Sequence, residues 1–289
     1  MKLSASVQSS THRALLFGPP KSGKSYLAGK LSSDFDILWF DLENGVDTLR
    51  QLPMEQQERI ELISLPDSRV YPIAIETMLK VIKGAPVDIC EEHGKVACAL
   101  CKKDAKPFSS IALNQLPSST VVVVDSLTQL TNSAIAHITK SQPDDYKLNY
   151  DDWANLGKLL DTFLSQVQQA RYNIVCISHE SEVAMEDGKK KLVPTAGTTN
   201  FSRNTAKYFD EVIYCEIKNR KHIAASSTLY SGNILTGSRT GSIMETSAEP
   251  SLVPIFKGVR SVVASVQTPA QTALSSLSKL SALNSLKKA

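Results

Sequence analysis

The feature that most constrains this chain is a glycine-rich stretch near its amino terminus, residues 18–25. It reads Gly-Pro-Pro-Lys-Ser-Gly-Lys-Ser and satisfies the pattern G-x-x-x-x-G-K-S/T of a phosphate-binding loop. Its glycines permit the backbone dihedrals that turn successive N–H groups towards an anion. A helix beginning at Lys24 would direct its positive dipole end at the phosphates. The predicted nucleotide contacts are Gly18, Pro19, Pro20, Lys21, Ser22, Gly23, Lys24, Ser25 and Tyr26.

The flanking residues support this interpretation over a surface loop that fits the pattern by chance. The apolar run at residues 13–17 predicts a buried strand, and Leu27 and Leu31 have helical spacing after the loop. In such a loop Lys24 contacts the β- and γ-phosphates and Ser25 binds Mg²⁺. The chain has no N-K-x-D guanine motif. The sequence therefore predicts binding of ATP with Mg²⁺.

The rest of the chain alternates strand and helix patterns. Apolar runs at residues 35–43, 60–65, 121–126 and 173–179 predict strands, and residues 71–82 and 151–170 predict helices. In the second helix Trp153 lies on the apolar stripe. This order favours an α/β fold with a doubly wound, mostly parallel central sheet flanked by helices. Residues 211–217 and 223–230 predict an antiparallel strand extension, joined by a basic stretch.

Acidic side chains follow two of the predicted strands. Asp125 ends the run of valines at 121–124, as in a Walker B element, which holds Mg²⁺ through its water shell. Capping of the next helix is the alternative role for Asp125. Glu43 follows a strand that we expect beside the strand of the phosphate-binding loop, where its carboxylate can orient the attacking water.

Cysteine and histidine residues cluster between the first long helix and the valine-rich strand. Cys90-x-x-His93 and Cys98-x-x-Cys101 supply four ligands in two close pairs, which is typical of a zinc site. Because all four positions are protein groups, a structural Zn²⁺ in a knuckle inserted at about residues 86–107 is predicted. A redox pair at Cys98 and Cys101, or chance, is the alternative. Basic residues surround the cluster: Lys95, Lys102, Lys103 and Lys106.

Composition excludes several classes of protein. The 289 residues carry a net charge of +3, which is too small to indicate nucleic-acid binding by itself. No apolar run is long enough to span a bilayer, and no signal-type apolar segment follows Met1. We therefore expect no membrane association. The expected location is the cytoplasm of a bacterial or phage-infected cell. We expect a core at residues 1–258 and a mobile or helical tail at 259–289, where leucine recurs every third residue.

The motif order resembles the RecA-type ATPase core over roughly residues 12–245. The order is the phosphate-binding loop, Phe40-Asp41-Leu42-Glu43, Val124-Asp125-Ser126 and Ile177-Ser178-His179. The Asp-Ser-Leu-Thr, Ser-His-Glu and Lys-Tyr-Phe-Asp-Glu-Val stretches are similar to phage-encoded, core-only relatives, the Sak-type single-strand annealing ATPases. The resemblance implies that Glu43 is the catalytic base and that His179 senses the γ-phosphate.

The resemblance also implies partners. It makes the polar segment 195–207 a mobile loop that binds single-stranded DNA through Arg203 and Lys207, with ATP at the interfaces of a homo-oligomer. Lys218, Arg220 and Arg239 become candidates for a cation that reaches a neighbouring subunit's γ-phosphate. Each of these basic residues could equally be a solvated surface charge. A single-strand DNA-binding protein is a further candidate partner.

Three functions follow from these features. The first is a recombination ATPase that binds and anneals single-stranded DNA, with hydrolysis stimulated by DNA. The second is a replication accessory or helicase-loader that uses ATP to act on protein partners. The third is a KaiC-like regulatory nucleotide-binding protein with little turnover. Filament, ring and short oligomer all remain open, because no polymerisation segment of the RecA kind is recognisable.

Overall fold

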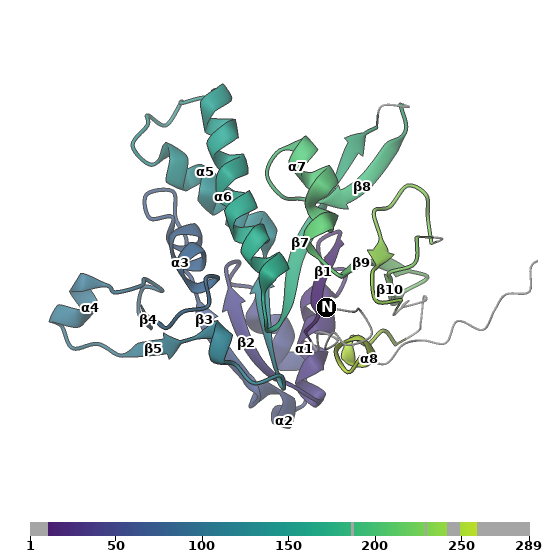
Figure 1. Cartoon of the computed structure of the whole chain (residues 1–289), viewed down its shortest axis with the longest axis horizontal. Helices are drawn as coiled ribbons and strands as arrows, with labels where there is room; N and C mark the ends of the chain where they lie inside the picture. Colours follow the sequence, from purple (N-terminus) through teal and green to yellow (C-terminus); the bar gives the residue numbers. More distant parts are fainter. Residues whose placement is uncertain (1–10, 186–187, 229, 242–248, 259–289) are drawn as a thin grey trace, which may run out of the picture.

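The protein is built around one large twisted sheet with helices on both faces (Figure 1). The computed structural model describes residues 11–185, 188–228, 230–241 and 249–258. Across this part of the chain the sheet has nine strands in the order β10-β9-β1-β7-β6-β2-β3, with β8 paired to β7 and β11 paired to β9. Pairing is parallel from β9 through β3, and β10, β11 and β8 are antiparallel. The predicted α/β fold with a mostly parallel sheet is confirmed.

The elements of the core have the following bounds. Strands of the large sheet are β1 (Arg13–Gly18), β2 (Asp36–Asp41), β3 (Ile60–Ser64), β6 (Thr120–Asp125), β7 (Asn173–Ala184), β8 (Lys190–Pro194), β9 (Glu211–Lys218), β10 (Lys221–Ala225) and β11 (Gly237–Ser238). Helices are α1 (Lys24–Gly29), α2 (Met54–Gln57), α3 (Ile73–Val81), α5 (Leu127–Thr139), α6 (Tyr150–Gln169), α7 (Thr199–Asn204) and α8 (Val253–Phe256). Short 3-10 helices occupy Lys30–Ser33, Val46–Gln51, Leu113–Gln115 and Thr205–Tyr208.

A separate antiparallel pair carries the cysteine–histidine cluster. It consists of β4 (Val87–Cys90) and β5 (Phe108–Ile111), with the short helix α4 (Ala99–Lys103) between them. In Figure 1 this unit, called the knuckle below, projects from one side of the large sheet. Its root is apolar, because Ile89 and Ile111 are buried in the main core.

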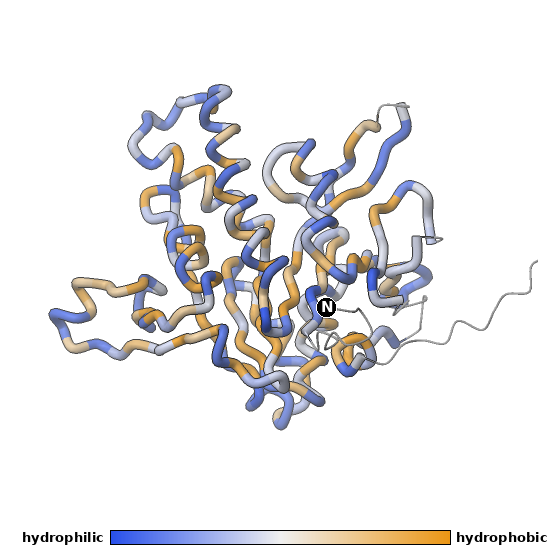
Figure 2. The backbone as a smooth tube through the Cα atoms, in the orientation of Figure 1, coloured by the Kyte–Doolittle hydropathy of each residue, from blue (hydrophilic) through white to orange (hydrophobic). Residues whose placement is uncertain are grey.

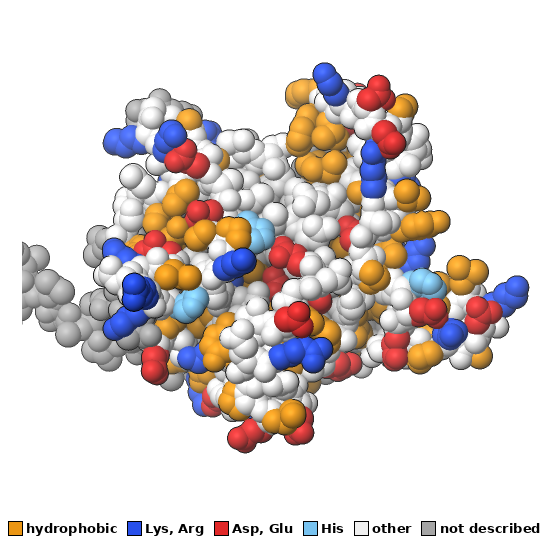
Figure 3. Space-filling model, turned by 180° about the vertical axis from the view of Figure 1, so that it is seen from behind, with side chains coloured by type: hydrophobic (Ala, Val, Ile, Leu, Met, Phe, Trp, Pro, Cys, Tyr) orange, Lys and Arg blue, Asp and Glu red, His pale blue; other side chains and the backbone are white. Residues whose placement is uncertain are grey.

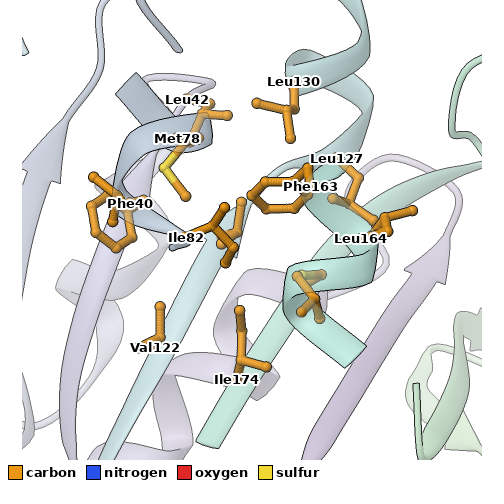
Figure 4. Packing of buried hydrophobic residues seen from close by; sticks show 14 of the residues in the cluster. Phe40, Leu42, Met78, Ile82, Val122, Leu127, Leu130, Phe163, Leu164 and Ile174 are labelled. Atoms are coloured by element: carbon orange, nitrogen blue, oxygen red, sulfur yellow. The ribbon is translucent and has the colours of Figure 1, made fainter. Parts of the chain in front are cut away.

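Apolar residues on both faces of the central strands form two core layers. All six residues of β6 are buried, as expected for a parallel strand covered on both sides. One layer packs α3, α5 and α6 against the sheet, and the other packs α1 and α8 against its opposite face. Figure 2 shows apolar residues along the central strands and polar residues at the tips, and Figure 4 shows the first layer, where Phe163 of α6 lies near Leu127 of α5.

The strand order corrects one expectation from the sequence. β2, which precedes Glu43, does not lie beside the strand of the phosphate-binding loop, because β7 and β6 lie between β2 and β1. The order of strands depends on how the connecting helices pack, which local patterns do not record. Since parallel strands end at the same edge, Glu43 still comes to the carboxyl edge of the sheet, where β1 and β6 also end.

Other segments differ from the sequence-based expectations in detail. Trp153 is 40% exposed and lies in the first turn of α6, so it does not continue the buried apolar stripe of that helix. The polar segment 195–207 is not an open loop but contains α7, because the Thr198 side chain caps the helix by accepting from the N–H of Phe201. The predicted tail at 259–289 lies outside the described residues. Among the helices of the described ranges, none combines the length and apolar character needed to cross a membrane.

Candidate functional site

The phosphate-binding loop connects β1 to α1 and is packed against the β9–β10 hairpin. Gly18 and Gly23 have φ of 149° and 90°, and Lys21 has a φ of 63°. A Cβ atom at Gly18 would lie 2.0 Å from the carbonyl oxygen of Cys215, and one at Gly23 would lie 2.7 Å from Nδ1 of His222. Both glycines are therefore required by conformation and by close packing.

The lysine and serine of the loop lie next to the predicted magnesium residue. Lys24 Nζ donates to the carbonyl oxygens of Gly18 at 3.0 Å and Pro19 at 2.8 Å. Burial lowers the pKa of Lys24, and the charges of nearby acidic groups oppose this effect. Ser25 Oγ donates to Asp125 Oδ2 at 2.8 Å. The fold thus places the hydroxyl and carboxylate expected to hold Mg²⁺ at one point.

A cleft of about 1120 Å³ opens over this loop. Predicted residues in its wall include Lys24, Ser25, Glu43, Asp125 and His179. Several other lining residues were not expected from the sequence: Lys30, Thr48, Gln51, Lys221, His222, Glu249 and Pro250. They come from segments without a motif, so no local signal marks them. Arg220, considered for a role in a neighbouring subunit's site, lines the cleft of its own chain.

Asp125 is held in an unusually buried position. Burial raises the pKa of Asp125 to about 7, the hydrogen bond from Ser25 opposes this, and the charge of Glu43 adds to it. Asp125 does not cap α5; the side chain of the next residue, Ser126, accepts from the N–H of Gln129 at 3.2 Å and is the N-cap. The carboxylate therefore has no structural role as a cap and is available to a cation.

This pKa predicts how stability depends on pH without added magnesium. The pKa of Asp125 in the folded protein lies above its ordinary value of 3.8, so between about pH 4 and 7 the folded chain binds the proton more tightly than the unfolded chain. This group therefore makes the free energy of unfolding fall as pH rises through that window. Asp125→Asn should remove this fall and exceed wild type in stability at pH 8, measured by urea unfolding.

The control for this measurement is Asp47→Asn, because the Asp47 side chain is 95% exposed. It should keep the wild-type dependence of stability on pH. If the free energy of unfolding of the Asp125→Asn protein declined between pH 5 and 8 as much as that of wild type, the inference that Asp125 is buried without a compensating charge would be wrong.

Glu43 and His179 meet at the mouth of the cleft. The Ser126 hydroxyl donates to Glu43 Oε1, and His179 Nε2 lies 3.5 Å from the same oxygen. Asp41 Oδ1 accepts from the backbone N–H groups of Glu43 at 3.2 Å and Gly45 at 3.3 Å, which shapes the turn that carries Glu43. Burial raises the pKa of Asp41. Three strand ends thus contribute to one polar cluster beside the phosphate-binding loop.

A chain of hydrogen bonds leads from this cluster towards α7. The N–H of His179 donates to Thr128 Oγ1 at 2.9 Å, and the carbonyl of His179 accepts from the N–H of Thr195 at 2.8 Å. The N–H of Gly197 donates to Thr131 Oγ1 at 3.2 Å. The segment before α7 is therefore tied both to the residue beside Glu43 and to α5.

The predicted DNA-contacting and in-trans residues are dispersed. Arg203 donates to the carbonyl of Ala184, and Lys207 Nζ lies 4.7 Å from the ring centroid of Tyr208. Lys218 Nζ lies 5.8 Å from the ring centroid of Tyr230. Arg239 Nη1 lies 4.0 Å from Asp210, which is bonded to Arg13 at the start of β1. Arg239 is thus at the opposite edge of the sheet from the phosphate-binding loop.

Comparison with known proteins places the nucleotide site in a family. A family model described as an AAA domain matches residues 10–253. The chain belongs to this AAA domain family. A solved structure described as a prototypical ATPase from the type III secretion system of pathogenic bacteria is 14% identical, with a TM-score of 0.41. The match covers 70% of this chain and 51% of that ATPase, so this chain spans about half its length. No curated protein matches the chain.

The AAA domain carries the cysteine–histidine cluster in its knuckle. His93 Nδ1 lies 3.1 Å from Cys101 Sγ, 3.9 Å from Cys98 Sγ and 4.0 Å from Cys90 Sγ. The four donor atoms all lie within 4.8 Å of one another, and the three cysteines are buried. A tetrahedral ion with Zn–S bonds of about 2.3 Å and a Zn–N bond of about 2.0 Å needs donors roughly 3.4–3.8 Å apart. The four predicted ligands are brought together at spacings within about 1 Å of those that such an ion needs.

The electrostatics of this cluster also fit a bound cation. The backbone N–H of Cys101 lowers the pKa of the Cys98 thiol, while burial and the neighbouring Cys90 and Cys98 raise the pKa of Cys101 to about 12. A cation bound between these sulfur atoms would favour the thiolate forms that metal binding requires. Participation of Cys90 and His93 distinguishes the cluster from a simple redox pair at Cys98 and Cys101.

Proposed function

We propose that the protein is an ATPase whose reaction takes place in the cleft over the phosphate-binding loop. The observation that carries the proposal is the meeting of Lys24, the Ser25–Asp125 pair and Glu43 in one cleft. Membership of the AAA domain family, whose members are P-loop ATPases, supports ATP binding and hydrolysis. Mg²⁺, when bound with ATP, would neutralise phosphate charge.

The residues of the cleft would divide the work as follows. Lys24 pairs with the β- and γ-phosphates, and Ser25 and Asp125 hold the ion. Glu43 accepts a hydrogen bond from the attacking water and orients it towards the γ-phosphate. Ser126 and His179 contact the same carboxylate oxygen of Glu43, so they fix the direction in which its other oxygen points.

We further propose that the core is RecA-like, related to the Sak-type annealing ATPases, and acts on single-stranded DNA. The hydrogen bonds from His179 through Thr195 to the segment before α7 support this, because they link the γ-phosphate end of the cleft to that segment. Figure 3, seen from behind, shows two projections with a hollow between them; comparison with Figure 1 assigns them to α5–α6 and to the β7–β8 hairpin with α7. We propose that single-stranded DNA runs from this hollow along α7, with Arg203 in α7 and Lys207 just after it as phosphate contacts.

The assembly proposed is a homo-oligomer in the cytoplasm, with a cation of one subunit completing the ATP site of the next. Arg220 and Lys218 lie at the turn between β9 and β10, where Asn219 and Arg220 have positive φ values of 53° and 62°. This tight turn places Arg220 in the wall of the cleft, and Lys218, the last residue of β9, lies two residues before it. A single-strand DNA-binding protein is proposed as a further partner.

We also propose Zn²⁺ as a second cofactor. Cys90, His93, Cys98 and Cys101 would hold it, and the complete set of four protein ligands makes the site structural. The ion would supply the folding energy of the knuckle, which has only a small apolar core of its own. The lysines around the knuckle would add to a DNA-binding surface.

ATP hydrolysis with and without single-stranded DNA tests the central proposal. We expect DNA to stimulate hydrolysis by about ten-fold at 50 mM salt and by less than about two-fold at 200 mM, because phosphate contacts are lost with salt. Lys207→Ala should weaken this stimulation, while Lys80→Ala, at an exposed lysine of α3 away from the hollow, should leave it unchanged. DNA-independent hydrolysis would favour the accessory that acts on protein partners, and absence of turnover would favour the regulatory protein.

A further inference from the structure

We infer that the metal-bound knuckle is a brace for the sheet edge that carries Glu43, so that loss of Zn²⁺ lowers catalytic turnover without removing the ATP site. The inference builds on the proposed ATPase function and adds a regulatory role to the metal centre. It rests on two sets of contacts. Residues 93–95 of the knuckle, called the knuckle tip below, pack against the end of strand β3, and the end of β3 is paired with the end of strand β2.

The first step is the link between the ligands and the knuckle tip. His93 is a ligand, and the N–H of the next residue, Gly94, donates to the carbonyl of Cys90 at 2.9 Å. The N–H of Cys90 in turn donates to the carbonyl of Lys95 at 3.0 Å. Gly94 has a φ of 66°, a conformation that a tight turn requires. An ion that joins Cys90 and His93 to the cysteines of α4 would therefore fix the path of residues 93–95.

The second step is the contact between the tip and the core. Gly94 is packed so closely that a Cβ atom there would lie 2.8 Å from the carbonyl oxygen of Ser64 and 2.9 Å from Leu65 Cδ2. Thr77 Oγ1 of α3 donates to the carbonyl of Gly94 at 2.7 Å and is itself buried. Lys95 Nζ lies 5.3 Å from the ring centroid of Tyr71. The tip thus packs against the carboxyl end of β3.

The third step connects β3 to the catalytic carboxylate. Ser64 is paired with Asp41, the last residue of β2, and the N–H of Leu65 donates to the carbonyl of Asp41 at 2.9 Å. The side chain of Asp41 holds the N–H of Glu43. Leu65 and Leu42 are buried in the same core layer, where Figure 4 shows Leu42 beside Met78 of α3.

These contacts are continuous from the metal ligands to Glu43. A displacement of the tip would therefore move the end of β3. That movement would shift Asp41, and with it the turn that carries Glu43. Misplacement of a catalytic group by about 1 Å can cost up to about 100-fold in rate, whereas the phosphate-binding loop lies on the other side of β7 and β6. Turnover should therefore respond more strongly than ATP affinity.

Two variants separate the binding of the metal from the contact between the knuckle tip and the core. Cys98→Ser with Cys101→Ser removes two ligands, and Thr77→Val removes the hydrogen bond to Gly94 without touching a ligand. Leu100→Ala is the control, because Leu100 is 66% exposed on α4 and alanine keeps the backbone N–H that interacts with Cys98. Metal content is read by zinc stoichiometry and by the absorption bands of tetrahedral cobalt–thiolate after Co²⁺ substitution.

We expect wild type, Leu100→Ala and Thr77→Val to bind one metal ion per chain and the double serine variant to bind none. kcat should fall about ten-fold in the double variant and about three-fold in Thr77→Val, with KM for ATP within about two-fold of wild type. Amide hydrogen exchange should accelerate at residues 62–67 in both variants.

The outcomes are distinguishable. Absence of zinc and of cobalt bands in wild type would overturn the metal site. A metal-free double variant with unchanged kcat and exchange at residues 62–67 would overturn the brace. If wild type hydrolysed no ATP, the proposed function would fall, but hydrogen exchange in Thr77→Val would still decide whether the knuckle holds the end of β3. Should the double variant not fold, Thr77→Val alone carries the test.

Discussion

Replacement of Glu43 by Gln is expected to lower kcat for ATP hydrolysis by about 10²–10⁴-fold, the range for loss of a positioned general base. The amide cannot accept the proton of the attacking water, although it keeps the size of the side chain and can accept the hydrogen bond from Ser126. Lys24, Ser25 and Asp125 are unchanged, so ATP affinity should remain within about three-fold of wild type. Single-turnover hydrolysis and equilibrium binding of a fluorescent ATP analogue measure the two quantities.

Glu61→Gln is the matched control, because Glu61 is an exposed acid on neighbouring β3 and is paired in register with β2. It should hydrolyse ATP at the wild-type rate. Turnover by Glu43→Gln within a few-fold of wild type would remove Glu43 from the mechanism and strengthen the interpretation as a regulatory protein. Loss of ATP binding in Glu43→Gln would instead show that the substitution disturbs the phosphate-binding loop.

Substitution of Gly18 by Ala should have the largest effect on stability, a loss of about 3–5 kcal/mol in the free energy of unfolding. The new Cβ would lie 2.0 Å from the backbone oxygen of Cys215, and the backbone has a φ of 149°. Because the obstacle is the backbone of β9 rather than a flexible side chain, β1 and β9 would have to separate. Urea unfolding measures the loss, and ATP binding should be lost as well.

Gly157→Ala provides the control for this substitution. Gly157 lies within α6, and a Cβ atom there would meet nothing within 4 Å. Alanine should therefore raise stability by about 0.5–1 kcal/mol, because it restricts the unfolded chain and favours the helix. Equal effects of the two substitutions would show that the contact between Gly18 and Cys215 does not limit the loop.

The sequence was sufficient wherever the chemistry depends on residues close together in the chain. The loop at 18–25, Asp125 after the valine run and the paired cysteine–histidine spacings were all recognised. Their side chains come together as expected at the Ser25–Asp125 contact and in the knuckle. In each case a short spacing or a single strand–loop–helix unit determines the local geometry.

The sequence was insufficient wherever a site is made from distant segments. The strand that precedes Glu43 was expected beside β1, but β7 and β6 lie between the two strands, because strand order is set by the packing of helices across the sheet. His222 and Arg220 were not recognised as part of the cleft wall, because their hairpin meets the phosphate-binding loop some 200 residues away in the chain, as in the bond between His222 and Ser22. The helix α7 was missed because a side-chain cap stabilises a segment with little apolar periodicity.

The sequence alone thus determined which chemical groups this protein brings together at the phosphate-binding loop and in the knuckle. The tertiary structure decided how they are connected: Glu43 to Ser126 and His179, and the knuckle tip to the ends of β3 and β2. The physical reason is that phosphate and metal binding require particular donor atoms at short, local spacings. Contacts between strand ends depend instead on the burial of apolar surface over the whole sheet, which leaves no mark in any one segment.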